Sequence, residues 1–384
     1  MVMKNNRQRM VLKELLANEK MLNREDLIFL LSLSEKEDLE ALYEAAYAVK
    51  TRYVGKKVYF RGIIEFSNVC RKNCYYCGIR KDNQKLTRYS MGLDEIVESA
   101  RWAYEAGYGS VVLQSGETQS RTFTGFIEKA VKGIKQVSSG ELGITLSLGE
   151  QDEDTYRRWF HASAHRYLLR IETSSEPLYR SLHPADHSFP ERLKCLETLN
   201  ALGYQTGTGV MIGLPGQTIE NLADDILFFE KMDVAMIGMG PYLPHQDTPL
   251  YAEYFDKLPF DRTQDDLLAP ALKMIAATRL YLKDVNIAST TALQAIAPTG
   301  REMGLLAGAN IIMPNITDVQ YRSLYQLYDN KPCINENSDT CVSCLSNRIT
   351  SIGETIGYNE WGDSPHFRSY QGLSGEVKTG KMLD

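Results

Sequence analysis

The sequence predicts an α/β protein built on a (β/α)8 TIM-type barrel, with an N-terminal helical extension and an irregular C-terminal tail that contains cysteines. Three observations support this fold class. Short apolar or β-branched runs alternate with longer helical stretches, eight such runs are present, and unusual polar residues follow the expected strand ends. We expect a helical layer over residues 1–55, the barrel over 56–330 and the tail over 331–384.

The first 52 residues are expected to be helical, because leucines recur at helical spacing, as at Leu12, Leu15 and Leu16. Ser34 followed by Glu37 fits a capping box. This segment carries no residues that suggest chemistry, so we expect it to form a packing layer.

The barrel is predicted from eight candidate strands and the helices between them. The strands are expected at 58–66, 110–114, 143–148, 166–171, 205–212, 234–239, 286–290 and 310–313. The helices are expected at 93–106, 123–137, 154–162, 191–202, 219–231 and 265–282. Alternation of this kind implies a parallel sheet with right-handed crossovers. Eight strands favour a closed barrel, and an open or partial barrel is the alternative. The carboxyl ends of the strands should then share one face, where enzymes with this fold carry their active sites.

Composition and charge exclude several classes of protein. The chain has 384 residues and a net charge of −6, which argues against a general nucleic-acid binder. No run of about 18 uncharged apolar residues is present, so we expect no membrane span. The polar N-terminus lacks the apolar core of a secretory signal, and we therefore expect a cytoplasmic protein.

The 7 cysteines are an odd number, which argues against a disulfide framework in a chain without an export signal. Cys195 stands alone on an expected helix and is interpreted as a core residue. The other six fall into two tight groups, and clustered cysteines in a reducing compartment favour metal or redox sites.

The first group follows the first strand and has the spacing CxxxCxxC, with Cys70, Cys74 and Cys77. Such a loop supplies three thiolates to a [4Fe–4S] cluster, which leaves one iron open to another ligand. A zinc site would more often use paired CxxC or Cys/His groups, and this loop contains no histidine.

This spacing resembles that of the radical S-adenosylmethionine (SAM) superfamily. The resemblance implies that SAM chelates the open iron and is reductively cleaved to methionine and a 5′-deoxyadenosyl radical. It also implies roles for particular residues: an aromatic contact with adenine at Tyr76, binding of the SAM amino group at Gly116 and Glu117, of ribose at Glu172, and of the carboxylate at Arg192. The full implied SAM-binding set is Tyr76, Gln114, Gly116, Glu117, Glu172, Arg192 and Met211.

A closer resemblance joins the chain to the HydE family of [FeFe]-hydrogenase maturases. The segments that carry it are 64–74, 112–117, 145–150, 167–173, 213–218 and 321–328. The resemblance implies one step in building the diiron subcluster of the hydrogenase H-cluster. Its implied substrate is a cysteine-bound iron carbonyl cyanide complex made by the maturase HydG, whose sulfur the adenosyl radical attacks. It further implies the scaffold maturase HydF and a flavodoxin or ferredoxin electron donor as partners.

Polar positions of the expected barrel match the substrate cavity of that family. The implied substrate-binding residues are Thr145, Ser147, Arg170, Met236, Thr290, Thr291 and Tyr328. Arg170 could clamp a carboxylate bidentately, and the methionine would be a soft, adaptable wall. Thr290 and Thr291 could equally be plain β-branched strand residues.

The second cysteine group lies in the tail, with Cys333, Cys341 and Cys344 spaced as C-x7-C-x2-C. Some HydE proteins bind an accessory cluster here, so the resemblance implies a [2Fe–2S] or [4Fe–4S] cluster, with surface zinc or free thiols as the alternatives. Near the first group, Arg71, Lys72, Arg80 and Lys81 could form a basic rim that steers an acidic electron donor, or simply a solvated loop.

Three other functions are consistent with parts of the sequence. A mutase of the methylornithine synthase type would share much of the barrel, although the tail cysteines count against it. A sulfur insertase like biotin synthase would need further cysteines on barrel strands. A non-catalytic iron–sulfur carrier would not need Glu117, Glu172 or Arg192.

Overall fold

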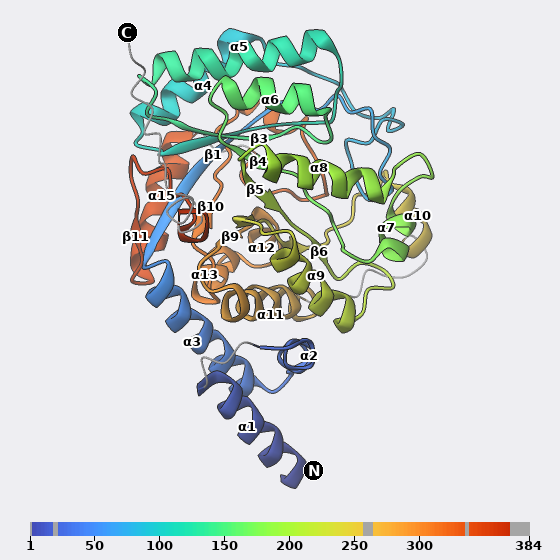
Figure 1. The fold of residues 1–384 in the computed structure, drawn as a ribbon, viewed down its shortest axis with the longest axis vertical. Coiled ribbons are helices and arrows are strands. Elements are labelled where there is room, and N and C mark those ends of the chain that lie inside the picture. The colour runs from blue at the N-terminus through green and yellow to red at the C-terminus, as the bar shows by residue number, and fades with distance from the viewer. Residues whose placement is uncertain (1, 18–21, 256–263, 335–337, 369–384) are drawn as a thin grey trace.

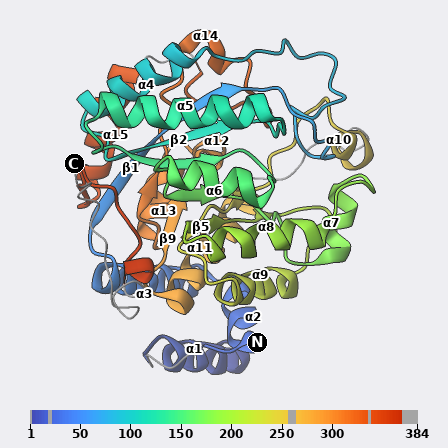
Figure 2. The same ribbon diagram turned by 45° about the horizontal axis from the view of Figure 1, so that its top comes forward.

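The computed structural model describes residues 2–17, 22–255, 264–334 and 338–368. Eight parallel strands form a closed barrel surrounded by helices (Figures 1 and 2). The strands are β1 (Lys57–Ser67), β2 (Ser110–Ser115), β3 (Gly143–Ser147), β4 (Arg166–Leu168), β5 (Gln205–Thr208), β7 (Met236–Ile237), β9 (Asn286–Ser289) and β10 (Ile311–Ile312). Closure comes from pairing of β10 with β1 at Tyr59↔Ile311 and Phe60↔Ile312. A barrel strand occurs at each of the eight predicted places, although the fourth, fifth and sixth are shorter than expected.

The helices of the outer ring also follow the prediction. The longer ones are α4 (Leu93–Glu105), α5 (Arg121–Val137), α6 (Glu153–His161), α8 (Phe189–Ala201), α9 (Ile219–Lys231) and α11 (Gln264–Leu282). Short helices connect them, namely α7 (Glu176–Leu182), α10 (Pro249–Tyr254), α12 (Thr291–Ile296), α13 (Gly300–Leu306) and α14 (Val319–Arg322). In α5, Ile127, Val131 and Ile134 recur at helical spacing and are fully buried, so this stripe holds the helix against the sheet.

The fifth predicted strand is broken in two, which differs from the continuous strand expected over residues 205–212. After β5 the chain leaves the barrel sheet, and β6 (Met211–Ile212) pairs with β8 (Gly240–Pro241). The close approach lies at Gly209, where a Cβ would be only 1.8 Å from the carbonyl oxygen of Gly238. Two glycines therefore let the strands cross backbone to backbone, which redirects β6 towards the top of the barrel.

Three helices precede the barrel: α1 (Val2–Ala17), α2 (Arg24–Ser32) and α3 (Lys36–Tyr53). The expected capping box at Ser34 is wrong, because the N-cap of α3 is Glu35, which makes no side-chain cap hydrogen bond. A capping box does occur one helix earlier, between Asn23 and Asp26. Lys273 of α11 connects the N-terminal helices to the outer helical ring, because its Nζ donates to the carbonyl oxygens of Leu31 and Leu33.

The tail is more regular than the sequence suggested. It forms α15 (Ser338–Ser351) and a two-residue strand, β11 (Thr355–Ile356), which pairs with the first residues of β1. Beyond β11 the chain covers the N-terminal end of the barrel. There the carbonyl oxygen of Gly362 accepts from Arg61 Nη2 at 3.0 Å and from Asn286 Nδ2 at 2.8 Å, and Asp363 accepts from Gln205 at 2.9 Å. None of the helices in the described part of the chain is long and apolar enough to cross a membrane.

The tail should loosen from the barrel at alkaline pH. The ion pairs of His366 with Asp284 (3.2 Å) and Asp233 (2.7 Å) raise its pKa from 6.5 to about 9. Because the folded-state pKa is the higher one, this stabilisation is complete below about pH 6.5 and is lost as the pH rises through about 9. After allowance for solvent screening, we expect His366→Gln to cost roughly 1–2 kcal/mol at pH 6 and almost nothing at pH 10.

Urea unfolding at the two pH values measures this difference, with the exposed His161→Gln as the matched control. An equal cost of the His366 substitution at pH 6 and pH 10 would contradict the ion-pair explanation.

Candidate active site

The three cysteines of the first group lie together in the loop that follows β1. Burial raises the pKa of Cys77, and the neighbouring Cys74 and Cys70 raise it further. Burial raises the pKa of Cys74 to about 12, so a bound cation is needed to hold that thiol as a thiolate near neutral pH. In the described part of the chain no three His, Cys, Asp or Glu side chains are arranged around a single ion. A cluster binds each thiolate through a different iron and needs a wider spacing, so the three thiols fit a cluster better.

Gly116 brings the loop after β2 against the cysteine loop. A Cβ at this position would lie 2.4 Å from the carbonyl oxygen of Val69 and 2.7 Å from Cys70 Cβ, so only glycine allows the contact. The two loops are joined beside it, since the amide of Glu117 donates to Cys70 Sγ at 3.3 Å and the amide of Arg71 donates to the Glu117 carbonyl oxygen at 2.8 Å. The Gly–Glu pair predicted from the sequence therefore touches the cysteine loop directly.

A buried network of charges extends from Glu117. Lys72 Nζ lies 3.6 Å from Glu117 Oε1 and 2.6 Å from Glu150 Oε2, and Arg192 Nε lies 2.7 Å from Glu150 Oε1. Burial opposes ionisation of Glu150, but the charges of Arg192 and Lys72 hold its pKa below the usual value. The same pairing outweighs burial at Arg192 and raises the pKa of its guanidinium. The site thus carries fixed charges of both signs next to the cysteines.

Glu150 was not among the predicted site residues, although it belongs to the strand-end segment that carried the family resemblance. Gly149, just before it, has a φ of +75° and would place a Cβ 2.3 Å from Glu117 Oε2. The amide of Glu150 donates to that same oxygen at 2.8 Å. The paired strand-end motifs of β2 and β3 therefore form one hydrogen-bonded unit, a contact that spacing along the sequence does not reveal.

Arg170 and Glu172 leave β4 side by side at the top of the barrel. Arg170 Nε donates to Glu172 Oε2 at 3.1 Å, and Arg170 Nη2 donates to the carbonyl oxygen of Val210 at 2.9 Å. Glu172 has a φ of +68°, a left-handed conformation that is strained for a residue other than glycine. Its carbonyl oxygen accepts from the amide of Met211 at 3.0 Å. Arg170, which was predicted to bind the substrate, is thus in contact with Glu172, which was predicted to bind SAM.

Tyr76 lies in a small apolar cluster that is separate from the main core. The other members are Leu178, Leu182, Met211, Leu214, Tyr242, Leu250, Tyr75 and Phe255. Its ring meets that of His183 edge-on, with centroids 5.5 Å apart and an interplanar angle of 89°. A half-buried aromatic ring in such surroundings offers a flat, apolar contact of the kind a purine base needs.

The interior of the barrel presents several of the predicted polar side chains. Register places Gln114 beside Ser147 and Val112 beside Thr145. Neither Thr145 Oγ1 nor Thr290 Oγ1 has a hydrogen-bond partner among the described residues, although both atoms are buried. Buried hydroxyl groups are normally satisfied, so these two suggest a ligand or water inside the barrel.

The remaining predicted cavity residues have other neighbours. Thr291 Oγ1 accepts from Arg301 at 2.9 Å. Tyr328 is half-buried, and its pKa is raised by burial first and then by Glu65. Met236 lies lower, because its sulfur accepts from Arg61 next to the tail residues that cover the barrel floor. With 1% of its surface exposed, Met236 packs in the floor.

The expected basic rim is smaller than the sequence suggested. Lys72 is almost buried, and its ammonium group faces Glu117 and Glu150 instead of solvent. Arg71 is exposed but also pairs with Glu117, at 2.9 Å. Of these cations, Lys81 is left as an exposed charge on the loop.

Of the tail cysteines, Cys333 lies next to α12 and Cys344 belongs to α15. Cys333 Sγ accepts from Gln294 Nε2 at 3.7 Å, and Cys344 is exposed. Arg348 pairs with Glu302 and also interacts electrostatically with both sulfurs. The side chain of Cys341 falls outside the described residues, so a cluster bound by all three cysteines stays a prediction.

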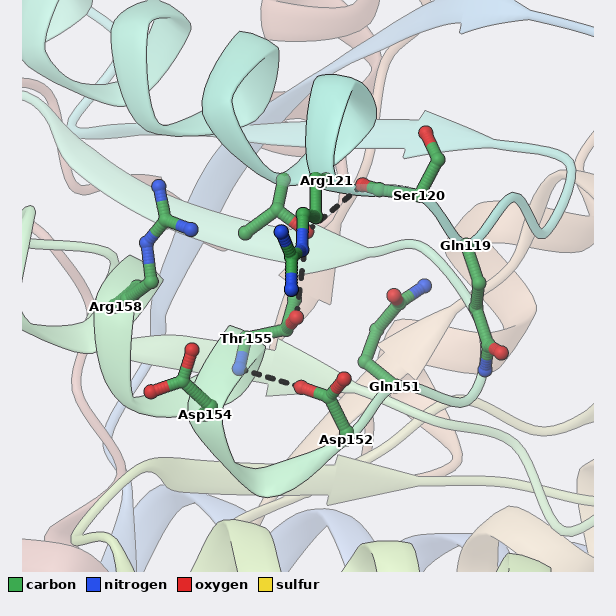
Figure 3. Close-up of a pocket in the computed structure, with 9 residues that line it drawn as sticks. Gln119, Ser120, Arg121, Gln151, Asp152, Asp154, Thr155 and Arg158 are labelled. Atoms are coloured by element: carbon green, nitrogen blue, oxygen red, sulfur yellow. Dashed lines mark hydrogen bonds between the residues drawn. The ribbon is translucent and has the colours of Figure 1, made fainter.

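A surface pocket of about 470 Å3 lies outside the barrel strands, where α5 and α6 begin (Figure 3). Its lining residues, which carry both signs of charge, are Gln119, Ser120, Arg121, Thr124, Gln151, Asp152, Asp154, Thr155 and Arg158. The side-chain Nε2 of Gln119 donates to the carbonyl oxygen of Glu150 at 2.6 Å, and the side-chain Nε2 of Gln151 donates to the carbonyl oxygen of Thr118 at 3.0 Å. These two glutamines brace the wall between the pocket and the buried charges.

Comparison with known proteins gives the family. The family model of the radical SAM superfamily matches residues 64–229. The [FeFe] hydrogenase maturase subunit HydE of Thermotoga maritima is 48% identical over 332 residues, which cover 86% of this chain and 91% of that protein. The chain belongs to the HydE family. It is therefore a radical SAM enzyme, and the family uses a [4Fe–4S] cluster and SAM.

More distant relatives share the fold of this HydE-family chain. The 3-methylornithine synthase of Methanosarcina acetivorans is 29% identical over 76% of this chain and 79% of its own. A crystal structure of methylornithine synthase superposes with a TM-score of 0.75 at 24% identity, and the match covers 94% of this chain and 99% of the synthase chain. The structure of the maturase HydG from Carboxydothermus hydrogenoformans superposes with a TM-score of 0.75 at 18% identity, and the match covers 92% of this chain and 80% of the HydG chain. These structures support the barrel architecture alone.

Proposed function

We propose that this enzyme carries out a step in maturation of the [FeFe]-hydrogenase H-cluster, acting on the sulfur of a cysteine-bound iron carbonyl cyanide substrate inside the barrel. The observation that carries the proposal is the 48% identity to a hydrogenase maturase, extending over 86% of the chain. When bound, the cluster and SAM supply a 5′-deoxyadenosyl radical by one-electron cleavage of SAM. HydG would supply the substrate, HydF would receive the product, and a flavodoxin or ferredoxin would supply the electron.

The residues around the cysteine loop divide into two groups in this proposal. Cys70, Cys74 and Cys77 hold the cluster. The SAM-binding set lies around them: Tyr76, Gln114, Gly116, Glu117, Glu172, Arg192 and Met211. The charges of this set match an amino acid zwitterion, with Glu117 for an ammonium group and Arg192 for a carboxylate. The apolar cluster around Tyr76 suits the adenine.

The barrel interior provides the substrate site. Thr145 and Thr290 have buried hydroxyl groups free to donate to a carboxylate or cyanide, and Ser147 lies beside Gln114. Arg170 bridges this site to Glu172, so substrate and SAM would meet at the top of the barrel. Thr291 and Tyr328 would complete the upper wall. We retain Met236 only as part of the floor beneath the substrate, because it contacts Arg61.

The proposal is tested by anaerobic reconstitution with iron, sulfide, SAM and a low-potential reductant. One sample receives the cysteine–iron carbonyl cyanide complex and a parallel sample receives lysine. Mass spectrometry of adenosyl products is the readout. A sulfur-linked adenosyl adduct formed only with the iron complex supports the maturase. Rearranged lysine with 5′-deoxyadenosine would instead support the second candidate, a mutase, which the 29% identity to 3-methylornithine synthase makes worth testing.

Arg170→Lys should separate substrate positioning from SAM cleavage. Lysine keeps the charge near Glu172 but cannot form the planar, two-pronged contact with a carboxylate. We expect the sulfur-linked adduct to fall about 10- to 100-fold, the cost of one charge-assisted contact, while 5′-deoxyadenosine formation stays within about threefold. The matched control is Arg180→Lys, an exposed arginine that pairs with Glu176 on α7. Equal losses of both products would contradict a role for Arg170 in holding substrate.

A further inference from the structure

Arg88 gathers the backbone of the cysteine loop around one guanidinium group. Its Nη1 donates to the carbonyl oxygens of Asn68 at 2.7 Å and Ile79 at 2.8 Å. Its Nη2 donates to those of Arg80 at 2.6 Å, of residue 81 at 3.3 Å and of Asn83 at 3.2 Å. These five carbonyls flank the cysteines on both sides, because one precedes Cys70 and four follow Cys77.

The base of the loop is closed beside this arginine. Asn68 is fully buried; its amide donates to the carbonyl oxygens of Thr87 at 2.9 Å and Leu324 at 2.8 Å, while its oxygen accepts from the amide of Tyr89 at 2.9 Å. Tyr89 hydroxyl in turn donates to the carbonyl oxygen of Glu65. With both ends fixed, Arg88 acts as the cross-brace of the intervening backbone.

The charge of Arg88 has no carboxylate partner among the described residues, since all of its hydrogen bonds go to neutral carbonyls. It is nevertheless held beside two of the cysteines, because the carbonyl groups that accept from its Nη1 belong to Asn68, two residues before Cys70, and to Ile79, two residues after Cys77. Lys72, Arg71 and Arg192 differ in this respect, because each faces Glu117 or Glu150. Arg88 is therefore an uncompensated positive charge held at the cysteine loop.

We propose that Arg88 is the positioning residue of the cluster: it fixes the loop that presents the three thiolates, and its charge raises the reduction potential of the bound [4Fe–4S] cluster. Reduction adds a negative charge to the cluster, so a nearby fixed cation stabilises the reduced form. The outer hydrogen bonds of metal ligands also govern how firmly the metal is held. The inference requires the cluster that the family uses and is independent of the substrate proposed above.

The test uses the full-length reconstituted protein without SAM or substrate, in which Cys333, Cys341 and Cys344 are replaced by alanine so that iron–sulfur signals come from the barrel loop. Arg88→Gln removes the charge, and Arg88→Lys keeps the charge but loses the two guanidinium nitrogens that donate to the loop carbonyls. Lys85→Gln is the control, because it removes from the same loop an exposed charge that is already paired, with Asp247 at 2.5 Å. A redox titration followed by electron paramagnetic resonance gives the midpoint potential, and iron release to a chelator gives the stability of the cluster.

We expect Arg88→Gln to have a lower midpoint potential than the wild type, and Arg88→Lys and Lys85→Gln to match it. Both Arg88 variants should release iron roughly tenfold faster or more, as other outer-shell changes do. A wild-type potential in Arg88→Gln would overturn the electrostatic part, and wild-type iron release in both variants would overturn the positioning part. Should Arg88→Gln fail to load iron, amide hydrogen exchange of the metal-free variants decides. Faster exchange over residues 77–83 supports the proposal, and unchanged exchange rejects it.

Discussion

Replacing Cys74 by serine should abolish SAM cleavage and remove the cluster from the barrel. Cys74 is the central cysteine of the loop, and it interacts electrostatically with both Cys70 and Cys77. With two thiolates left, an iron–sulfur cube loses a second protein ligand, whereas serine differs by one atom and should leave the fold intact. We expect 5′-deoxyadenosine formation to fall at least about 10³-fold, since the radical chemistry begins at the cluster.

The control for this change is the same substitution in the tail. Cys344→Ser alters an exposed cysteine, so it should lower total iron only if the tail binds a second cluster, and it should keep SAM cleavage within about twofold of wild type. Iron content, electron paramagnetic resonance with and without SAM, and 5′-deoxyadenosine formation are measured on both variants. Wild-type cleavage by Cys74→Ser, or its loss in Cys344→Ser alone, would move the reactive cluster away from the barrel loop.

The positions of the strands could be predicted from the sequence because each one is a short apolar run followed by a turn. The break between β5 and β6 could not, because it depends on Gly209 meeting Gly238, which lies about 30 residues further along the chain, between β7 and β8. The same holds for Glu150, whose importance comes from its contacts with Lys72 and Arg192. The local sequence pattern therefore predicts strands and helices, while the buried charge network forms only when the loops after β1, β2 and β3 meet in the fold.

The cavity residues show a second limit of sequence reasoning. Met236 belongs to a barrel strand, as expected, but its sulfur contacts Arg61 in the barrel floor, and Arg61 in turn donates to the carbonyl oxygen of the tail residue Gly362. Arg88 carried no recognisable signal, because its partners are backbone carbonyls, which any sequence provides. Residues that act on the backbone of a loop are thus the ones that spacing and residue type cannot reveal.

Replacing Arg192 by lysine should weaken SAM binding while leaving the cluster in place. The guanidinium lies in the network that links Glu150 and Lys72 to Glu117, and its Nη1 also donates to the carbonyl oxygen of Arg170 at 3.3 Å. Lysine preserves the positive charge, so Glu150 keeps cations on both sides, Lys72 at Oε2 and the new lysine near Oε1. It loses the planar pair of donors that fits a carboxylate. We expect the KM for SAM to rise about 10- to 100-fold, equivalent to one charge-assisted hydrogen bond.

This prediction distinguishes a SAM-binding role of Arg192 from a structural one. If the arginine only held α8 against the barrel, Arg192→Lys would lower thermal stability and iron content together with activity. If it binds SAM, iron content and the unfolding midpoint stay at wild-type values, and saturating SAM restores most of the cleavage rate, since the loss lies in binding. Arg180→Lys, an exposed change on the neighbouring helix, should alter none of these quantities. A KM for SAM unchanged in Arg192→Lys would leave the charge network as a support for Glu117 and assign the SAM carboxylate to another donor.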